Sequence, residues 1–139
     1  MTNWLETYRG VVYPWQCDHM GHMNVMWYVG KFDEATWILF AHLGITPEYM
    51  RKENRGMVAV RQETDYKKEV LAGDVLAIRS RVLEVRDKVI RFVHEMRNDA
   101  NGDLAAVTTF TGVHLDRQLR KGVAFPPEIK SRVEQHLGT

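Results

Sequence analysis

The residues best suited to chemistry lie in one polar stretch, residues 17–24, which reads Cys-Asp-His-Met-Gly-His-Met-Asn. An apolar run with the 3.6-residue period of a helix follows it, and Asn24 is a good N-cap for that helix. The start of a helix presents unpaired backbone N–H groups and the positive end of the macrodipole. Asp18 places a nucleophile or general base beside those groups. This pattern predicts attack on a carbonyl carbon and stabilisation of the oxyanion that forms.

Most side chains of this stretch also have structural explanations. An aspartate in a loop commonly caps a nearby N–H group, and Asn24 is chiefly a helix cap with a secondary contact to substrate as a further role. His22 either contacts Asp18 or a substrate, or holds the loop through a backbone carbonyl, and the sequence favours neither explanation. Cys17 lies beside the helix start, a place that favours reactive thiols. No His/Asn arrangement accompanies it, and we rank it below Asp18 as a nucleophile.

The elements that must position these residues follow from hydrophobic periodicity. A strand is expected over residues 5–16, with a possible bulge at Gly10, and a long helix over residues 24–43, ended by Gly44. Because this helix is apolar on nearly all sides, we expect it to be buried. Four strands with alternating apolar residues are expected in a meander, over residues 57–67, 75–86, 89–98 and 104–115. A last helix, opened by prolines, is expected over residues 126–137.

This order of elements predicts an α+β chain with a single domain over residues 1–139. An antiparallel sheet of about five strands would curve around the one long helix. Since the exposed edges of such a sheet need cover, we expect a dimer that pairs two sheets edge to edge.

The composition excludes several classes of protein. The 139 residues carry a net charge of +1, which gives no general attraction to nucleic acid or to an anionic membrane. A single cysteine excludes a disulfide framework, and no cluster of residues has the spacing of metal ligands, so we expect no metal. Since no apolar run is long enough to span a bilayer and the first residues lack a basic region followed by an apolar run, we expect neither a membrane span nor a signal peptide. The expected location is therefore the cytoplasm.

A longer pattern surrounds the polar stretch. The signature Asp-x-x-Gly-His-Met-Asn at residues 18–24 is followed by Tyr28, Phe32, Asp33 and Ala35, then by Tyr66 and a Leu-Ala-Gly-Asp-Val-Leu turn at residues 71–76. With these residues the chain resembles the hotdog-fold acyl-CoA thioesterases of the 4-hydroxybenzoyl-CoA thioesterase type. The resemblance covers about residues 8–115 and implies the hotdog fold, in which a curved antiparallel sheet wraps one long helix.

The resemblance implies hydrolysis of an acyl-CoA to the free acid and CoA. It assigns the catalytic carboxylate to Asp18, as nucleophile or general base, and the oxyanion donor to a backbone N–H at the helix start, best placed at Val25. His22 and Asn24 complete the predicted catalytic group, and no cofactor is expected besides the CoA of the substrate. Members of this family dimerise through the sheet, and the active site lies across the subunit interface. We therefore expect a homodimer assembled into a homotetramer.

The predicted substrate-binding residues are Arg86, Lys88, Trp27, Tyr28 and Asp33. Arg86 and Lys88 lie in a hairpin turn that matches a region where some members bind the CoA phosphates. Trp27 and Tyr28 belong to an aromatic cluster that forms either core and dimer interface, or an acyl pocket for an aryl, branched or cationic group. Asp33 either lines that pocket or touches the partner subunit; alternatively it pairs with Lys31 or lies at a solvated edge.

Two other functions remain open at this point. One is a hotdog-fold dehydratase or hydratase that acts on a thioester, and the other is a non-catalytic acyl-CoA-binding protein. Addition of water to an enoyl thioester without thiol release would identify the first, and acyl-CoA binding without hydrolysis the second. The acyl group itself is not encoded in any motif of the sequence.

Overall fold

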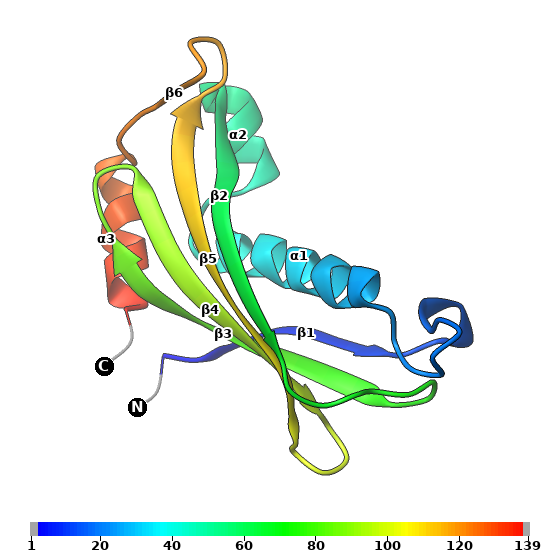
Figure 1. Cartoon of the computed structure of the whole chain (residues 1–139). Coiled ribbons are helices and arrows are strands. Elements are labelled where there is room, and N and C mark those ends of the chain that lie inside the picture. Colours follow the sequence, from blue (N-terminus) through cyan, green and yellow to red (C-terminus); the bar gives the residue numbers. More distant parts are fainter. Residues whose placement is uncertain (1–2, 138–139) are drawn as a thin grey trace.

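The computed structural model describes residues 3–137, which form a six-stranded antiparallel sheet that curves around one long helix, α1 (Figure 1). Strand β1 (Leu5–Val11) leads through a 3-10 turn, η1 (Pro14–Gln16), into α1 (Val25–His42). Two shorter helices are α2 (Pro47–Glu53) and α3 (Pro127–Gln135). The remaining strands are β2 (Arg55–Tyr66), β3 (Val75–Val85), β4 (Val89–Asn98), β5 (Leu104–Asp116) and the two-residue β6 (Lys121–Gly122).

The strands lie in the order β1-β3-β4-β5-β2, with β6 paired to β5. The expected meander is therefore right for β3, β4 and β5 but wrong for β2, which pairs with β5 rather than with β3. Residues 67–74 carry the chain from β2, at one edge of the sheet, back to β3 beside β1. Alternation of apolar residues identifies the buried face of a strand but not its neighbour, so the pattern missed this crossover.

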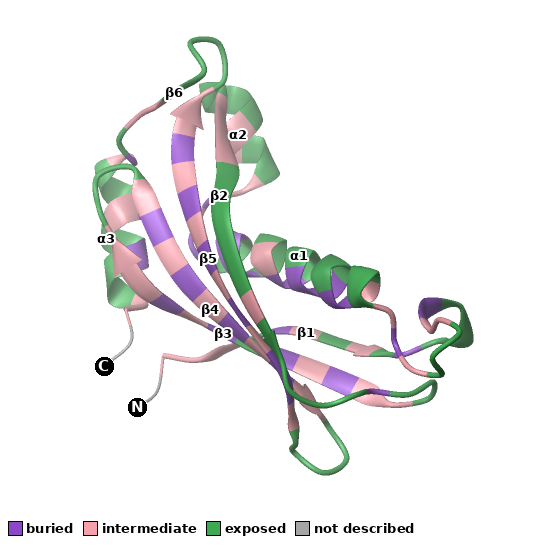
Figure 2. Ribbon diagram, in the orientation of Figure 1, coloured by how far each residue is buried: buried purple, intermediate pink, exposed green. Residues whose placement is uncertain are grey.

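Helix α1 begins and ends at the residues that carried helix signals. The Asn24 side chain accepts a hydrogen bond from the Met26 N–H, and Gly44 has a φ of 84° just after the last turn. Tyr28, Phe32, Ala35, Leu39 and Leu43 are buried against the sheet. The expectation of complete burial is wrong, because the sheet covers only one side of the helix in a single chain (Figure 2). The exposed apolar residues of α1 include Val25, Met26, Val29, Trp37 and Ile38.

Strand β1 differs from the prediction in its length and in its bulge. It ends at Val11 because Pro14 opens η1, and its irregularity lies between Glu6 and Tyr8 rather than at Gly10. Gly10 has a different structural role, because a Cβ at this position would lie 2.4 Å from Tyr8 Oη. The missing side chain leaves room for the Tyr8 hydroxyl, which accepts a 2.8 Å hydrogen bond from the buried Lys31 Nζ. Among residues 3–137, Lys31 makes no ion pair with Asp33.

A chain of hydrogen bonds crosses the core and joins four elements. Thr36 of α1 donates to Phe32 O over 3.0 Å, so its hydroxyl accepts the Nε2–H of His94 on β4 over 2.8 Å. The other ring nitrogen of His94 accepts from Ser80 on β3, whose oxygen lies 2.7 Å from Thr7 Oγ1 on β1. Burial lowers the pKa of His94 to about 3. The ring is therefore neutral, and its two hydroxyl partners satisfy both nitrogens.

Candidate active site

The loop between η1 and α1 is a small hairpin fixed to the rest of the fold. Cys17 and Met23 form an antiparallel bridge across it, and the Gly21 N–H donates to Asp18 O over 3.0 Å. Gly21 has a φ of 88°, a conformation that favours glycine. The Met23 N–H donates to Val70 O, in the crossover, over 2.8 Å. These contacts hold Asp18 in one position relative to the helix start.

Both carboxylate oxygens of Asp18 accept hydrogen bonds. Oδ1 accepts the Met20 N–H over 2.9 Å, and Oδ2 accepts the Asn24 side-chain N–H over 2.7 Å. The Met20 N–H first, and then the Asn24 amide, hold the pKa of Asp18 below its ordinary value of 3.8. The carboxylate is therefore ionised at neutral pH, which is the form that attacks a carbonyl carbon or takes a proton from water.

Asn24 connects this carboxylate to the first turn of α1. While its Nδ2 donates to Asp18, its Oδ1 accepts the Met26 N–H over 2.9 Å and its backbone oxygen accepts the Trp27 N–H over 2.9 Å. The N–H of Val25, the first helical residue, has no hydrogen-bond acceptor among residues 3–137. It is one of the donors that a helix start leaves unpaired. The geometry thus places a free donor next to the residue that holds the carboxylate.

The other polar side chains of the loop contribute less. His22 Nδ1 lies 3.5 Å from Met23 O, and its Nε2 lies 3.6 Å from a carboxylate oxygen of Glu69. In the part of the chain that the structure describes, His22 makes no hydrogen bond to Asp18. His19 is exposed. Cys17 is half-buried, with its Sγ 3.9 Å from Tyr13 O.

A pocket of about 190 Å³ adjoins the helix start. The rings of Tyr28 and Tyr66 meet edge to face on its wall, with 5.2 Å between their centroids. The Tyr28 hydroxyl donates to Lys68 O over 3.1 Å, and burial raises the pKa of Tyr28. Trp27 is not in this wall and packs against the core instead. The full lining is His22, Met23, Val25, Tyr28, Tyr66, Lys67, Lys68 and Glu69.

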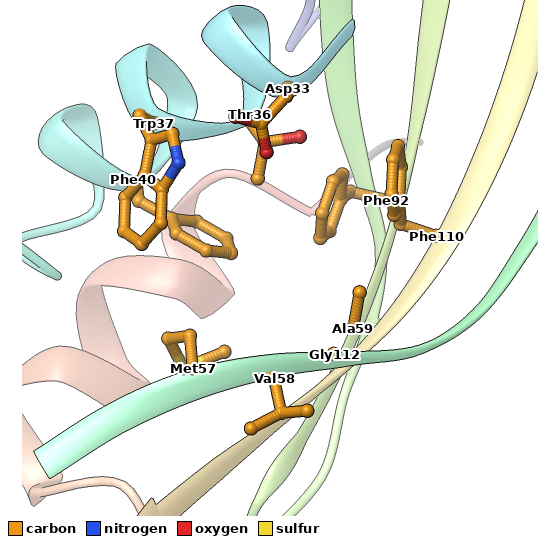
Figure 3. A pocket seen from close by; sticks show the side chains of 10 residues that line it. All are labelled: Asp33, Thr36, Trp37, Phe40, Met57, Val58, Ala59, Phe92, Phe110 and Gly112. Atoms are coloured by element: carbon orange, nitrogen blue, oxygen red, sulfur yellow. The ribbon is translucent and has the colours of Figure 1, made fainter. Parts of the chain in front are cut away.

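A second pocket of about 110 Å³ lies farther along α1, between the helix and the sheet (Figure 3). It contains Asp33, one of the predicted substrate-binding residues. Eight residues separate Asp33 from Val25, which is about 12 Å along a helix. Asp33 therefore lies in a different pocket from the one at the helix start of the same chain. The lining is Asp33, Thr36, Trp37 and Phe40 of α1, Met57, Val58 and Ala59 of β2, Phe92 of β4, and Phe110 and Gly112 of β5.

Arg86 and Lys88 lie far from Asp18 within one chain. Val11 pairs with Val75 at the start of β3, so the loop that carries Asp18 lies near that end of the strand. The hairpin with Arg86 and Lys88 follows the other end of β3, about 35 Å away at the rise of an extended strand. Arg86 also donates to a Glu84 carboxylate oxygen over 2.8 Å. A single chain does not bring this hairpin to the candidate active site.

Sequence reasoning did not group the residues of the second pocket. Asp33, Trp37 and Phe40 have the i, i+4, i+7 spacing of one helix face, a signal that was available. Phe92 and Phe110 come from strands whose arrangement the pattern did not specify. In the part of the chain described, no three His, Cys, Asp or Glu side chains gather in a way that could hold a metal ion. No helix there is long and apolar enough to cross a membrane.

Comparison with known proteins gives matches over most of the chain. A family model described as "Thioesterase-like superfamily" matches residues 12–133. The L-carnitine dehydrogenase/betainyl-CoA thioesterase of Agrobacterium fabrum is 30% identical over 120 residues, which make up 86% of this chain and 24% of that protein. The betainyl-CoA thioesterase of Pseudomonas aeruginosa is 24% identical over 134 residues, 96% of this chain and 84% of that protein.

The chain thus spans about a quarter of the Agrobacterium protein but most of the Pseudomonas protein. Among solved structures, a Staphylococcus aureus protein in complex with CoA superposes with a TM-score of 0.88 at 17% identity. The superposition covers 100% of this chain and 87% of that chain. This likeness confirms the hotdog fold predicted from the sequence.

Proposed function

Because this chain belongs to the thioesterase-like superfamily, we propose that it hydrolyses an acyl-CoA thioester to the free acid and CoA. The observation that carries the proposal is the position of the ionised Asp18 carboxylate. Asn24 holds it at the start of α1, beside the unpaired N–H of Val25. The two groups needed for acyl transfer, an attacking carboxylate and an oxyanion donor, are thereby adjacent.

Asp18 acts as a nucleophile or as a general base. As a nucleophile, its oxygen bonds to the thioester carbon, the C–S bond breaks, and the CoA thiolate leaves and takes up a proton; water then hydrolyses the mixed anhydride. As a base, Asp18 takes a proton from water while the water oxygen bonds to the same carbon; the tetrahedral intermediate then collapses, its C–S bond breaks, and the CoA thiolate leaves and takes up the proton that Asp18 holds. In both cases negative charge develops on the thioester oxygen. The Val25 N–H stabilises that charge, and one such donor is typically worth about 3 kcal/mol.

The pocket at the helix start suits the CoA side of the substrate. Lys67 and Lys68 line it, and cationic side chains complement phosphate groups. Arg86 and Lys88 contact CoA only if a further subunit brings their hairpin to it, as the expected tetramer would. No cofactor besides the CoA of the substrate takes part in this mechanism.

We propose a homodimer, two of which form a tetramer. Strand β2 has 12 residues and lies at the edge of the sheet, so its outer hydrogen-bonding groups can pair with another strand. The exposed apolar residues of α1 described above, together with Val58 and Val60 of β2, are surface that a second copy would cover. Sedimentation equilibrium tests the assembly, and a monomer at all concentrations would contradict it.

A thiol-release assay tests the proposed activity. Both curated relatives carry betainyl-CoA thioesterase in their names, so betainyl-CoA is the first substrate, followed by aryl, short, branched and long acyl-CoAs. We expect thiol release from at least one of these by the wild-type protein. Release from none of them, by protein shown to be folded, would overturn the proposed function.

A further inference from the structure

The second pocket, between α1 and strands β2, β4 and β5, combines aromatic rings with one acid. We propose that Asp33, Trp37, Phe40, Phe92 and Phe110, here called the aromatic cage, bind a quaternary ammonium group at the end of the acyl chain. This inference rests on the proposed function, since it names the kind of thioester that the site prefers. It also makes Asp33 and Trp37 specificity-determining residues.

Two neighbouring ring pairs of the cage meet nearly at right angles, whereas Phe92 and Phe110 stack with 14° between their planes and 5.3 Å between their centroids. The planes of Trp37 and Phe40 are 89° apart, with 5.8 Å between centroids, and those of Phe40 and Phe92 are 77° apart, with 5.5 Å between centroids. Such walls surround a compact group on several sides. A cation within about 6 Å of a ring centroid is attracted by the face of the ring, and the attraction is stronger in a desolvated site. Phe40 and Phe92 are almost fully buried, whereas Trp37 is partly exposed at the mouth.

Asp33 supplies a negative charge to this pocket. It lies one turn before Trp37 on the same face of α1, and Figure 3 shows Asp33 and Thr36 across the cavity from the β2 residues. No Lys, Arg or His is among the lining residues, all of which belong to the described part of the chain. The volume of about 110 Å³ is well below the roughly 300 Å³ at which pockets for drug-sized ligands begin. The cage therefore suits a compact cationic group better than a long acyl chain.

The core holds the helix firmly at this pocket. Thr36, next to Trp37 in sequence, accepts a hydrogen bond from the fully buried His94 and donates to Phe32 O. This contact fixes the backbone of the turn that carries Asp33 and Trp37. A site whose walls are already in place binds without the cost of ordering them.

The pocket at the helix start does not suit the same group. It also has two rings and an acid, Tyr28, Tyr66 and Glu69, but Lys67 and Lys68 line it as well. Two ammonium groups repel a cation more than one exposed carboxylate attracts it. The charge distribution thus separates a CoA side from an acyl side.

The distance along α1 determines whether Asp18 of the same chain or of a second copy attacks a thioester whose acyl group is bound in the cage. Asp33 is about 12 Å from Val25 of the same chain, whereas a short acyl chain places its ammonium group only a few bonds from the thioester carbon. The cage therefore holds the acyl group of a thioester that Asp18 of a second copy attacks. The proposed dimer supplies that copy, and each site combines one chain's cage with the other chain's helix start.

Two matched substrates test the cage. (Trimethylammonio)acetyl-CoA carries a cation, and 3,3-dimethylbutanoyl-CoA is its neutral isostere with a carbon in place of nitrogen. We expect the wild-type enzyme to prefer the cationic substrate in kcat/KM, and Asp33→Asn or Trp37→Leu to lower that preference about tenfold or more. Glu34→Gln, which changes the neighbouring exposed acid outside the pocket, should leave it unchanged. Equal kcat/KM values for the two substrates in the wild-type enzyme would overturn the inference while the thioesterase activity stood.

Mixing variants tests the shared site. Asp18→Asn and the double variant Asp33→Asn/Trp37→Leu, exchanged in a 1:1 mixture, form mixed dimers in which one site has all native residues. Activity on the cationic substrate should return to about a quarter of the wild-type value, as random pairing in a two-fold dimer predicts. Activity no higher than the mean of the two separate variants would show that the cage and Asp18 do not act from different chains.

A direct binding measurement separates the two proposals. Tetramethylammonium chloride, titrated against a sodium chloride control, should change the tryptophan fluorescence of the wild-type protein and not that of Trp37→Phe. This result would support the cage even if no acyl-CoA were hydrolysed. An identical response of both proteins would count against the cage.

Discussion

Asn24 hydrogen-bonds at the same time to the Asp18 carboxylate, over 2.7 Å, and to the Met26 N–H in the first turn of α1, over 2.9 Å. A single side-chain amide therefore caps the helix and orients the candidate catalytic group. Val25 lies between Asn24 and Met26 in the sequence, and this arrangement leaves its N–H free to face a substrate.

Replacing Asp18 with asparagine should abolish most thioester hydrolysis. The amide cannot act as base or nucleophile, and loss of such a group typically lowers the rate about 100-fold or more. Since Asp18 is only half-buried, the variant should unfold at nearly the wild-type temperature. The rate is measured by thiol release and the unfolding by circular dichroism. Full activity of Asp18→Asn on every substrate would exclude the assigned role.

The acid limb of kcat/KM should lie below pH 3.8, the ordinary pKa of an aspartate. The hydrogen bonds from Met20 and Asn24 lower the pKa of Asp18, so the reactive carboxylate persists as the pH falls and is lost only below that value. Short assays over a range of acidic pH values would measure the acid limb of the kcat/KM profile. As a control for denaturation, the enzyme is returned to neutral pH and its activity is measured again. A limb well above pH 3.8 would mean that another group controls the rate.

Two substitutions of Asn24 should separate its two roles. Asn24→Ala removes both the cap and the contact with Asp18, and loss of a cap typically costs about 1 kcal/mol of unfolding free energy. Asn24→Ser keeps a capping oxygen but does not reach Asp18. It should therefore retain most of the stability, while the pKa of Asp18 rises and the acid limb moves to higher pH. If the two variants were alike in stability, the cap seen in the structure would contribute little.

The buried His94 should make stability depend on pH. Its folded pKa of about 3 lies below the ordinary value of 6.5, so between these values the unfolded chain binds a proton that the folded chain does not. The contribution to stability is complete above pH 6.5 and is lost as the pH falls, by up to about 1.4 kcal/mol per pH unit. Urea unfolding at several pH values measures the free energy of unfolding as a function of pH. This free energy should change less with pH for His94→Gln than for the wild-type protein. The same pH dependence of the unfolding free energy in both proteins would show that His94 is charged in the folded state.

The sequence predicted the parts of this molecule that local chemistry determines. Asn24 and Gly44 mark the two ends of α1 because each acts on backbone groups within a few residues. The position of β2 beside β5 depends on contacts between distant segments, which no local pattern contains. Burial of Lys31 was equally hidden, because its partner Tyr8 lies on another element.

The residues of the candidate site likewise fall into those that local sequence predicts and those that only the fold brings together. Asp18 and Asn24 lie within one short loop, so their types and spacing predicted a carboxylate at a helix start. The aromatic cage assembles Trp37 and Phe40 with Phe92 and Phe110 from separate strands. Only the folded sheet brings these rings together, and only the structure shows that Asp33 lies with them rather than with Asp18.

The crossover between β2 and β3 links the chemistry to the order of folding. Val70 O in this segment accepts the Met23 N–H, and Lys68 O accepts the Tyr28 hydroxyl, so the crossover holds the helix start from outside. Its two ends continue into β2, which pairs with β5, and β3, which pairs with β1 and β4, so its position depends on both strands being in the sheet. Contacts between such distant segments form slowly. We therefore expect activity during refolding to return only when β2 and β3 are both in the sheet, since the helix start lacks these two contacts until then.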